Sequence, residues 1–190
     1  IKGKCLIAGT LFDFRIKPGI SFKPRITIEK IGDKTKKIDP KVIDNLVFNI
    51  GMIEMPSYWK TVCSPKILIE AGKLDKEQTA WWKKLMIDGM GQFFYENKIN
   101  WKKPNFLEIK STGSNPGKIY DKKLKDNYLV PFAGGRDSIV TLESLKKQKK
   151  NITLFTVNPI EKIQKVVKVS EIKKQIIVKR QIDKTLLDLN

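Results

Sequence analysis

The chain has 190 residues, of which 41% are hydrophobic, so it is long and apolar enough for one or two globular domains with a buried core. Its 38 Lys and Arg against 20 Asp and Glu give a formal net charge of +18, which favours an anionic partner such as a nucleic acid, a phosphorylated metabolite or an acidic lipid. Histidine is absent and the two cysteines have no metal-ligand spacing, which excludes the common zinc sites and leaves acid–base chemistry to Asp, Glu, Lys, Tyr or Cys.

The lysines are spread through the chain, with runs at 34–37, 122–125 and 146–150, and arginine is scarce. Recognition of bases and phosphates often uses clustered arginine, so most of these lysines are expected to form solvated faces. No stretch resembles a signal peptide or an apolar run of membrane length. The sequence therefore predicts a cytoplasmic protein with reduced thiols and no membrane span.

The first predicted elements are two antiparallel strands. Apolar and polar residues alternate at 12–15 and 22–29, and Pro18-Gly19 between them is typical of a turn. Asp39-Pro40 then opens a helical pattern of apolar residues that runs to Ile53, with Asp39 as the expected N-cap. A short apolar run at 67–69 predicts another strand.

A second helix is expected from Asp75, which begins a capping-box pattern, and it should break or bend near Gly89 and Gly91. The aromatic residues in and after this helix are interpreted as core, although a base-stacking platform is the alternative; they are Trp81, Trp82, Phe93, Phe94, Tyr95 and Trp101. A strand at 104–110 and a loop at 111–117 follow. We place a boundary there, between an α+β N-terminal domain (1–117) and a second domain (118–190).

The second domain alternates strands and helices: strand 128–132, helix 137–147, strand 152–157, helix 159–169 and strand 175–179. This order predicts an α/β fold with a parallel sheet. Ligands bind such sheets at the carboxyl ends of the strands, which here are Phe132 and Val157-Asn158.

The loop after the first of these strands reads Ala133-Gly-Gly-Arg-Asp-Ser138. Gly134 and Gly135 can adopt positive φ and let backbone N–H groups approach an anion, and Asp137 or Ser138 can cap the helix that follows. The loop is neither a Walker A nor a dinucleotide motif. It resembles the PP-loop of the ATP pyrophosphatase superfamily, S-G-G-x-D-S, with Ala133 in place of Ser; the alternative is an ordinary glycine turn.

The PP-loop resemblance implies an ATP-binding domain of about five parallel strands. Only about three strands fit after Tyr128, so we expect the domain to be incomplete at its C-terminus. In that superfamily the end of the second strand lies beside adenosine, which makes Thr156, Val157 and Asn158 candidates for nucleotide binding. A strand that ends in an Asn-Pro turn is the alternative for Asn158.

From about Asn49 onward the chain also resembles the UDP-N-acetylmuramoyl-L-alanyl-L-glutamate epimerase family. The resemblance rests on Ser57-Tyr-Trp-Lys60, Cys63-Ser-Pro65, Ala71-Gly-Lys-Leu74, Phe93-Phe-Tyr-Glu-Asn97, Val130 to Ser138, Val157-Asn-Pro159, Arg180-Gln-Ile-Asp183 and Leu189-Asn190. It implies an isomerase of peptidoglycan precursor synthesis that uses ATP and Mg²⁺ to invert the terminal L-Glu of an anionic UDP-sugar dipeptide, with release of AMP and pyrophosphate.

In that scheme the loop residues 133–138 hold the ATP phosphates, Arg136 or nearby lysines offset charge as pyrophosphate leaves, and Asp137 either binds Mg²⁺ or caps its helix. The epimerising base is not identified. Asp137 and Cys63 are the two catalytic candidates; the alternative for Cys63 is that it serves only as a small, buried hydrophobic side chain. Arg180 and Asp183 are candidates for binding the substrate carboxylate or a metal, or they form a surface ion pair.

Two further functions are compatible with the sequence. One is a tRNA-modifying PP-loop enzyme that adenylates its substrate, although neither a clustered basic face nor a zinc module is visible near the loop. The other is a non-catalytic nucleic-acid-binding module whose Gly-Gly-Arg loop holds phosphates, which would bind with a steep salt dependence and release no AMP.

Overall fold

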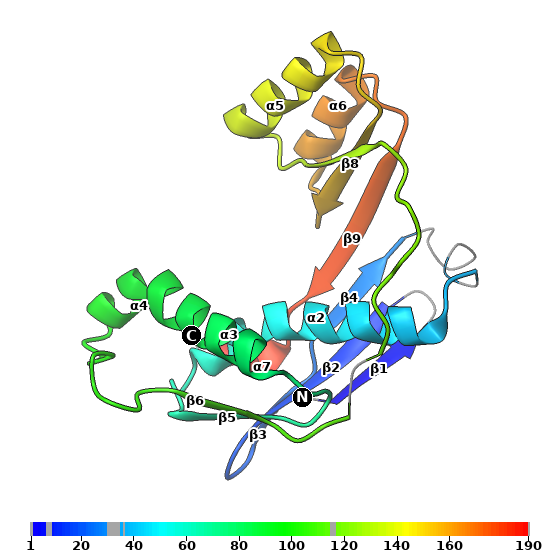
Figure 1. Ribbon diagram of the computed structural model, residues 1–190. Coiled ribbons are helices and arrows are strands. Elements are labelled where there is room, and N and C mark those ends of the chain that lie inside the picture. Colours follow the sequence, from blue (N-terminus) through cyan, green and yellow to red (C-terminus); the bar gives the residue numbers. More distant parts are fainter. Residues whose placement is uncertain (1, 7–8, 30–34, 36, 115–116, 190) are drawn as a thin grey trace.

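The computed structural model describes residues 2–6, 9–29, 35, 37–114 and 117–189 (Figure 1). Most strands in these residues join one seven-stranded sheet in the order β1–β2–β4–β9–β8–β7, with β3 also paired to β2. In that order the strands are Lys2–Leu6, Gly9–Ile16, Arg25–Ile28, Gln175–Gln181, Ile152–Val157 and Tyr128–Pro131, and β3 is Ile20–Phe22. The fold is a mixed α/β fold, which confirms the predicted class in its general form.

The antiparallel half of the sheet is formed by β1 to β4. The expected turn at Pro18-Gly19 joins β2 to β3, which confirms the two-strand prediction. The second predicted strand is divided at Lys23 and Pro24, because proline has no N–H to donate to the ladder. The carbonyl of Pro24 still accepts a 3.0 Å hydrogen bond from the N–H of Phe12, so the segment continues along β2.

The parallel half consists of β7, β8 and β9, with Tyr128 opposite Ile152 and Leu154 opposite Gln175. Helices α5 (Arg136–Lys147) and α6 (Glu161–Val169) connect these strands and lie side by side over them (Figure 1). The order predicted for this region is confirmed element by element. Between helices and strands lies a small core of Val130, Phe132, Leu142, Ile152, Leu154 and Val167.

The two halves meet at β4 and β9, which pair antiparallel with Ile26 opposite Arg180. Strand β9 therefore has a parallel neighbour on one side and an antiparallel neighbour on the other, so the sheet as a whole is mixed and not parallel. The sheet runs across the boundary placed near residue 117. The division into two domains, and the incompleteness of the second, stay predictions.

Helix α2 (Pro40–Trp59) packs against β1 and β2 (Figure 1). Asp39 caps it as predicted, because its carboxylate accepts a 2.9 Å hydrogen bond from the N–H of Lys41. The helix runs past Ile53 and through Pro56, further than the apolar pattern indicated. Pro56 lies in the last turn, where it removes a single helical hydrogen bond, and the buried Trp59 holds that turn on the core.

Outside the large sheet, β5 (Lys66–Ile69) and β6 (Glu108–Ser111) form a two-stranded parallel sheet beside α3 (Lys76–Gly89) and α4 (Gly91–Glu96). The capping box at Asp75 and the break between Gly89 and Gly91 are both confirmed. The chain is described to the end of α7 (Lys184–Asp188) and the residue after it. None of the helices in the described ranges is long and apolar enough to cross a lipid bilayer.

The core prediction for the aromatic residues is correct for part of the group. Trp82 and Phe94 are buried, and the Phe94 ring stacks on Trp101 with centroids 5.5 Å apart. Trp81 and Tyr95, in contrast, are 55% and 80% exposed. Together with α2, β2, β5 and β6, the buried aromatic residues form a hydrophobic cluster much larger than that of the parallel half.

Candidate functional site

The loop between β7 and α5 lies at the carboxyl edge of the parallel strands, where the sequence predicted it. Phe132 is buried, and its N–H donates a 2.8 Å hydrogen bond to the carbonyl of Phe155 in β8, which fixes the start of the loop. Gly134 has a φ of +72°, a conformation that favours glycine. Gly135 is extended, so only one of the two glycines uses the conformational freedom expected of both.

The helix that follows is not capped by a side chain, which corrects the expectation for Asp137 and Ser138. Gly135 occupies the N-cap position, and Asp137 and Ser138 lie inside the first turn. The Ser138 hydroxyl donates a 2.8 Å hydrogen bond back to the Gly135 carbonyl, so it satisfies an acceptor and no helical N–H. The first N–H groups of α5 therefore face the loop with no side-chain acceptor, as an anion-binding helix end requires.

The carboxyl end of β8 lies next to this loop but is held mainly by its own sheet. The Thr156 side chain is buried, and its hydroxyl accepts a 3.0 Å hydrogen bond from Gln175 in β9. Val157 is 45% exposed. Asn158 has a φ of +44°, and its amide side chain accepts from the N–H of Arg180 (2.8 Å) and donates to the carbonyl of Arg180 (2.7 Å). The adenosine role of these three residues stays a prediction.

Arg180 and Asp183 both contact the N-terminal half of the chain. The Arg180 guanidinium forms a two-pronged ion pair with the buried Glu54 of α2, with Nε–Oε1 and Nη2–Oε2 distances of 2.7 and 3.0 Å. This pairing raises the pKa of Arg180. Asp183 caps α7 by accepting from the N–H of Thr185 (2.8 Å) and also accepts from the N–H of Lys23 (2.6 Å).

The surface pair between Arg180 and Asp183 is therefore not formed; the partner of Arg180 is Glu54. Sequence reasoning missed Glu54, although one signal was available. It lies four residues after Ile50 and four before Tyr58, which places a carboxylate on the packed face of α2. A buried carboxylate requires a partner, so the position itself indicated a cation elsewhere in the chain.

Cys63, the catalytic candidate, is half-buried and borders the large hydrophobic cluster. Burial raises the pKa of its thiol, so the environment does not favour the reactive thiolate. Its catalytic role stays a prediction, as does that of Asp137, which is exposed at the loop. No cluster of three or more His, Cys, Asp or Glu occurs among the described residues, so Asp137 would bind Mg²⁺ only together with the substrate phosphates and water.

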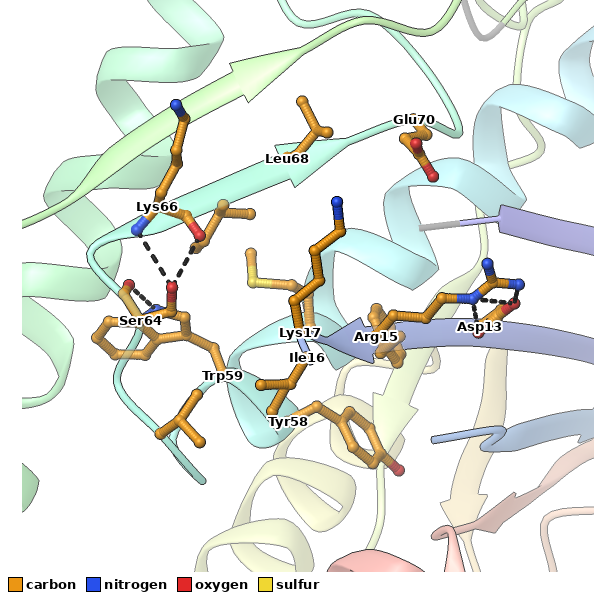
Figure 2. Close-up of a pocket in the computed structure, with 14 residues that line it drawn as sticks. Asp13, Arg15, Ile16, Lys17, Tyr58, Trp59, Ser64, Lys66, Leu68 and Glu70 are labelled. Carbon is orange, nitrogen blue, oxygen red and sulfur yellow. Dashed lines mark hydrogen bonds and ion pairs between the residues drawn. The ribbon is translucent and has the colours of Figure 1, made fainter. Parts of the chain in front are cut away.

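A separate cavity of about 890 Å³ lies between the end of β2, the end of α2 and β5 (Figure 2). Its base is apolar, with Trp59 held by a 2.7 Å hydrogen bond from its ring nitrogen to the Ser64 carbonyl. Its rim carries mixed charges from Asp13, Arg15, Lys17, Lys66 and Glu70. Asp13 and Arg15 pair at 2.6 Å, so their charges largely cancel. No sequence motif indicated this cavity.

Comparisons with known proteins support the family resemblance. The family model described as the MurL N-terminal domain matches residues 7–190. Two curated proteins named UDP-N-acetyl-alpha-D-muramoyl-L-alanyl-L-glutamate epimerase, from Salinispora tropica and a Micromonospora species, are each 30% identical to the chain over 138 and 139 residues. The matches cover 70% of this chain but only 29% of each relative. No solved structure matches the chain.

Proposed function

Because the chain belongs to the MurL N-terminal domain family, we propose that it supplies the ATP-binding loop of an epimerase that acts on UDP-N-acetylmuramoyl-L-alanyl-L-glutamate. The relatives that carry this name are more than three times as long as the matched part of the chain, so the activity belongs to the full-length protein. The observation that carries the proposal is the turn from β7 through Gly134 into the uncapped N-terminus of α5.

The residues at this turn fit a triphosphate. The positive φ at Gly134 turns the chain so that successive N–H groups can line a concave anion site. A side chain at Gly135 would project into open space, because no atom lies within 4 Å of an added Cβ. That space is where phosphates could approach the backbone. Arg136 and Asp137 directly follow Gly135 and are both exposed. In this proposal Arg136 offsets phosphate charge and Asp137 contacts Mg²⁺.

Activation by ATP gives the reaction a physical rationale. A free carboxylate makes the neighbouring α-proton very hard to remove, because a carbanion would form beside a negative charge. In the proposed reaction a substrate carboxylate oxygen attacks the α-phosphorus of ATP and pyrophosphate leaves, which gives an acyl adenylate. A protein base then removes the α-proton, a proton is added to the opposite face, and hydrolysis releases AMP.

Arg180 and Asp183 have a different place in this proposal from the one the sequence suggested. The Arg180 guanidinium is already paired with Glu54, and Asp183 already accepts two backbone hydrogen bonds. A direct contact with substrate would have to compete with these partners. We propose that both residues mainly hold the end of β9, and through it Asn158, in position beside the loop.

The test is to incubate the full-length protein with ATP, Mg²⁺ and UDP-N-acetylmuramoyl-L-alanyl-L-glutamate, and to measure AMP and the chirality of the glutamate after hydrolysis. We expect AMP in proportion to D-Glu. D-Glu without AMP would refute activation by adenylation, and AMP stimulated by tRNA instead of the dipeptide would favour the tRNA-modifying alternative. No specific observation favours that alternative or the non-catalytic nucleic-acid module.

A further inference from the structure

The two ends of the parallel strands β7, β8 and β9 differ in charge. Three short loops leave the strands at the carboxyl edge, at 132–135, 158–160 and 182–183; they contain no lysine or arginine, although Arg136 directly follows the first of them and opens α5. The segments just before the strands, at 121–127, 148–151 and 170–174, contain seven lysines, which we call the amino-edge lysines: Lys122, Lys123, Lys125, Lys149, Lys150, Lys173 and Lys174. The segments that enter these strands therefore carry more positive charge than the loops that leave them.

The entering segments lie side by side in space. The N–H of Tyr128 donates a 2.7 Å hydrogen bond to the carbonyl of Asn151, and the N–H of Leu154 donates a 2.9 Å hydrogen bond to the carbonyl of Lys174. The Lys150 ammonium lies 5.6 Å from the centre of the Tyr128 ring. The residues directly before the three strands are therefore neighbours at the amino edge, and Lys125 lies three residues before Tyr128, with Lys122 and Lys123 further back in the segment that leads to it.

These lysines have few partners within the protein. All seven are exposed, and none forms an ion pair with another of the described residues. The nearby carboxylates, Asp121, Asp126 and Glu171, are fewer than the lysines. Lys147 and Lys168 add charge from the last turns of α5 and α6, where they also stabilise the helix dipoles, whereas Lys146 is paired with Glu143 at 3.2 Å. The loop lysines have no such structural role.

Exposed aliphatic side chains accompany the lysines. Leu124, between Lys123 and Lys125, is 76% exposed, and Val169 at the end of α6 is 80% exposed. Tyr120 and Tyr128 are also partly exposed, at 40% and 38%, but the entering segments contain no arginine. Nucleic-acid surfaces generally present arginine together with stacked aromatic rings, whereas a lipid interface accepts lysine charge, aliphatic side chains and tyrosine. From this combination we propose that the amino edge binds the surface of a bilayer that contains anionic lipid.

This binding mode leaves the proposed ATP loop accessible. Strand β8 has six residues, so the two edges are separated by about 20 Å at 3.3 Å per residue. A protein that rests on a membrane through its amino edge would present its carboxyl edge to the solvent. The inference depends only on the charge and exposure at the amino edge, so it stands whether or not the loop binds ATP.

The experiment is co-sedimentation of the 190-residue chain with two kinds of vesicle. One contains phosphatidylcholine alone, and in the other about one lipid in three is the anionic phosphatidylglycerol. We expect binding only to the anionic vesicles, and loss of most of it in high salt. Each lysine near an anionic surface strengthens binding roughly fivefold, so replacing Lys122, Lys123 and Lys125 with Gln should weaken it roughly 100-fold.

The matched control replaces Lys73, Lys98 and Lys103 with Gln, which changes the net charge equally at exposed sites away from the amino edge. It should weaken binding several-fold less than the first variant. Leu124→Ser tests the aliphatic contribution and should weaken the binding that remains in high salt. Equal loss in both lysine variants would overturn the proposal, as would binding to a random-sequence RNA that is tighter than vesicle binding and equally sensitive to Lys122, Lys123 and Lys125.

Discussion

The two hydrophobic clusters of the chain differ in size and in what they support. Of the described residues, 18 buried side chains form the cluster around α2, α3 and α4, whereas six form the cluster under α5 and α6. The proposed ATP loop is anchored in the smaller cluster, because Phe132 at the start of the loop belongs to it. Among the described residues, the larger cluster contains most of the aromatic side chains and includes no residue of the loop at 133–138.

The parallel half, which carries the loop, has a small hydrophobic core, so its stability depends on contacts with the rest of the protein. The parallel half is attached to the larger half through the pairing of β4 with β9 and through the ion pair between Glu54 and Arg180. Regions with few buried apolar contacts open at lower free energy than the rest of a protein. We expect the parallel half to be the first part to open, and the following variants to test how far its stability depends on the larger half.

The largest effect is expected in the large cluster. Phe94→Ala removes a fully buried ring that contacts Trp59, Trp101 and Phe106, and should lower the free energy of unfolding by about 4 kcal/mol. Urea denaturation followed by tryptophan fluorescence would measure it. Tyr95→Ala, next in the chain but exposed, is the control and should change stability by about 0.5 kcal/mol or less. Equal effects at both positions would contradict the core assignment.

The connection between the halves should have the next largest effect. Glu54→Ala leaves the Arg180 guanidinium without its partner in a partly buried site, and we expect a loss of about 3 kcal/mol in unfolding free energy. The double variant Glu54→Leu with Arg180→Met removes both charges and should recover most of that loss. If Glu54→Ala alone had the unfolding free energy of the wild type, the ion pair would not contribute to the connection between the halves.

The two glycines of the loop allow stability and nucleotide binding to be separated. Gly134→Ala forces a Cβ into a left-handed conformation and should cost about 1 kcal/mol in unfolding free energy. Gly135→Ala should cost no more than Gly134→Ala, because its backbone is extended and the space around it is open, although alanine is a poorer N-cap than glycine. If phosphates occupy that space, ATP titration of Gly135→Ala should show at least a tenfold loss of affinity. Unchanged affinity would argue against the proposed phosphate site.

The smallest effect is expected from pH. Partial burial acts to raise the pKa of Asp183, but hydrogen bonds from the N–H groups of Lys23 and Thr185 lower it overall. A lowered folded-state pKa adds stability above the ordinary value near 4, and this stability is lost as pH falls through the folded-state value. Thermal unfolding of wild type and Asp183→Asn should therefore differ at neutral pH, begin to converge near pH 4 and become equal only below the lowered folded-state pKa. A constant difference would contradict the assignment.

The local structure was largely predictable from the sequence. Asp39 and Asp75 carry recognisable cap patterns, and the apolar runs from Tyr128 to Lys179 have the lengths and order of alternating strands and helices. The turn at Gly134 was predictable because a left-handed residue between strand and helix favours glycine. The role of Ser138 was not, because a hydroxyl can accept from an N–H or donate to a carbonyl and the sequence does not distinguish the two.

The long-range contacts could not be predicted. The pairing of β4 with β9 joins residues about 150 positions apart, and neither strand carries a signal that specifies its neighbour. The same holds for Glu54 and Arg180, whose pairing depends on that register. The sequence therefore placed a boundary near residue 117 but could not indicate that one sheet runs across it. The cavity beside Trp59 was missed for the same reason, since it forms between segments that only the tertiary fold brings together.

The most direct test of the ATP site is hydrogen–deuterium exchange of the full-length protein with and without ATP and Mg²⁺. If the loop binds the phosphates, the amides of residues 134–138 should be protected most strongly, with weaker protection at 157–160. Protection confined to residues 13–17 and 64–70, which line the separate cavity, or no change at the loop at saturating ATP, would contradict the proposal.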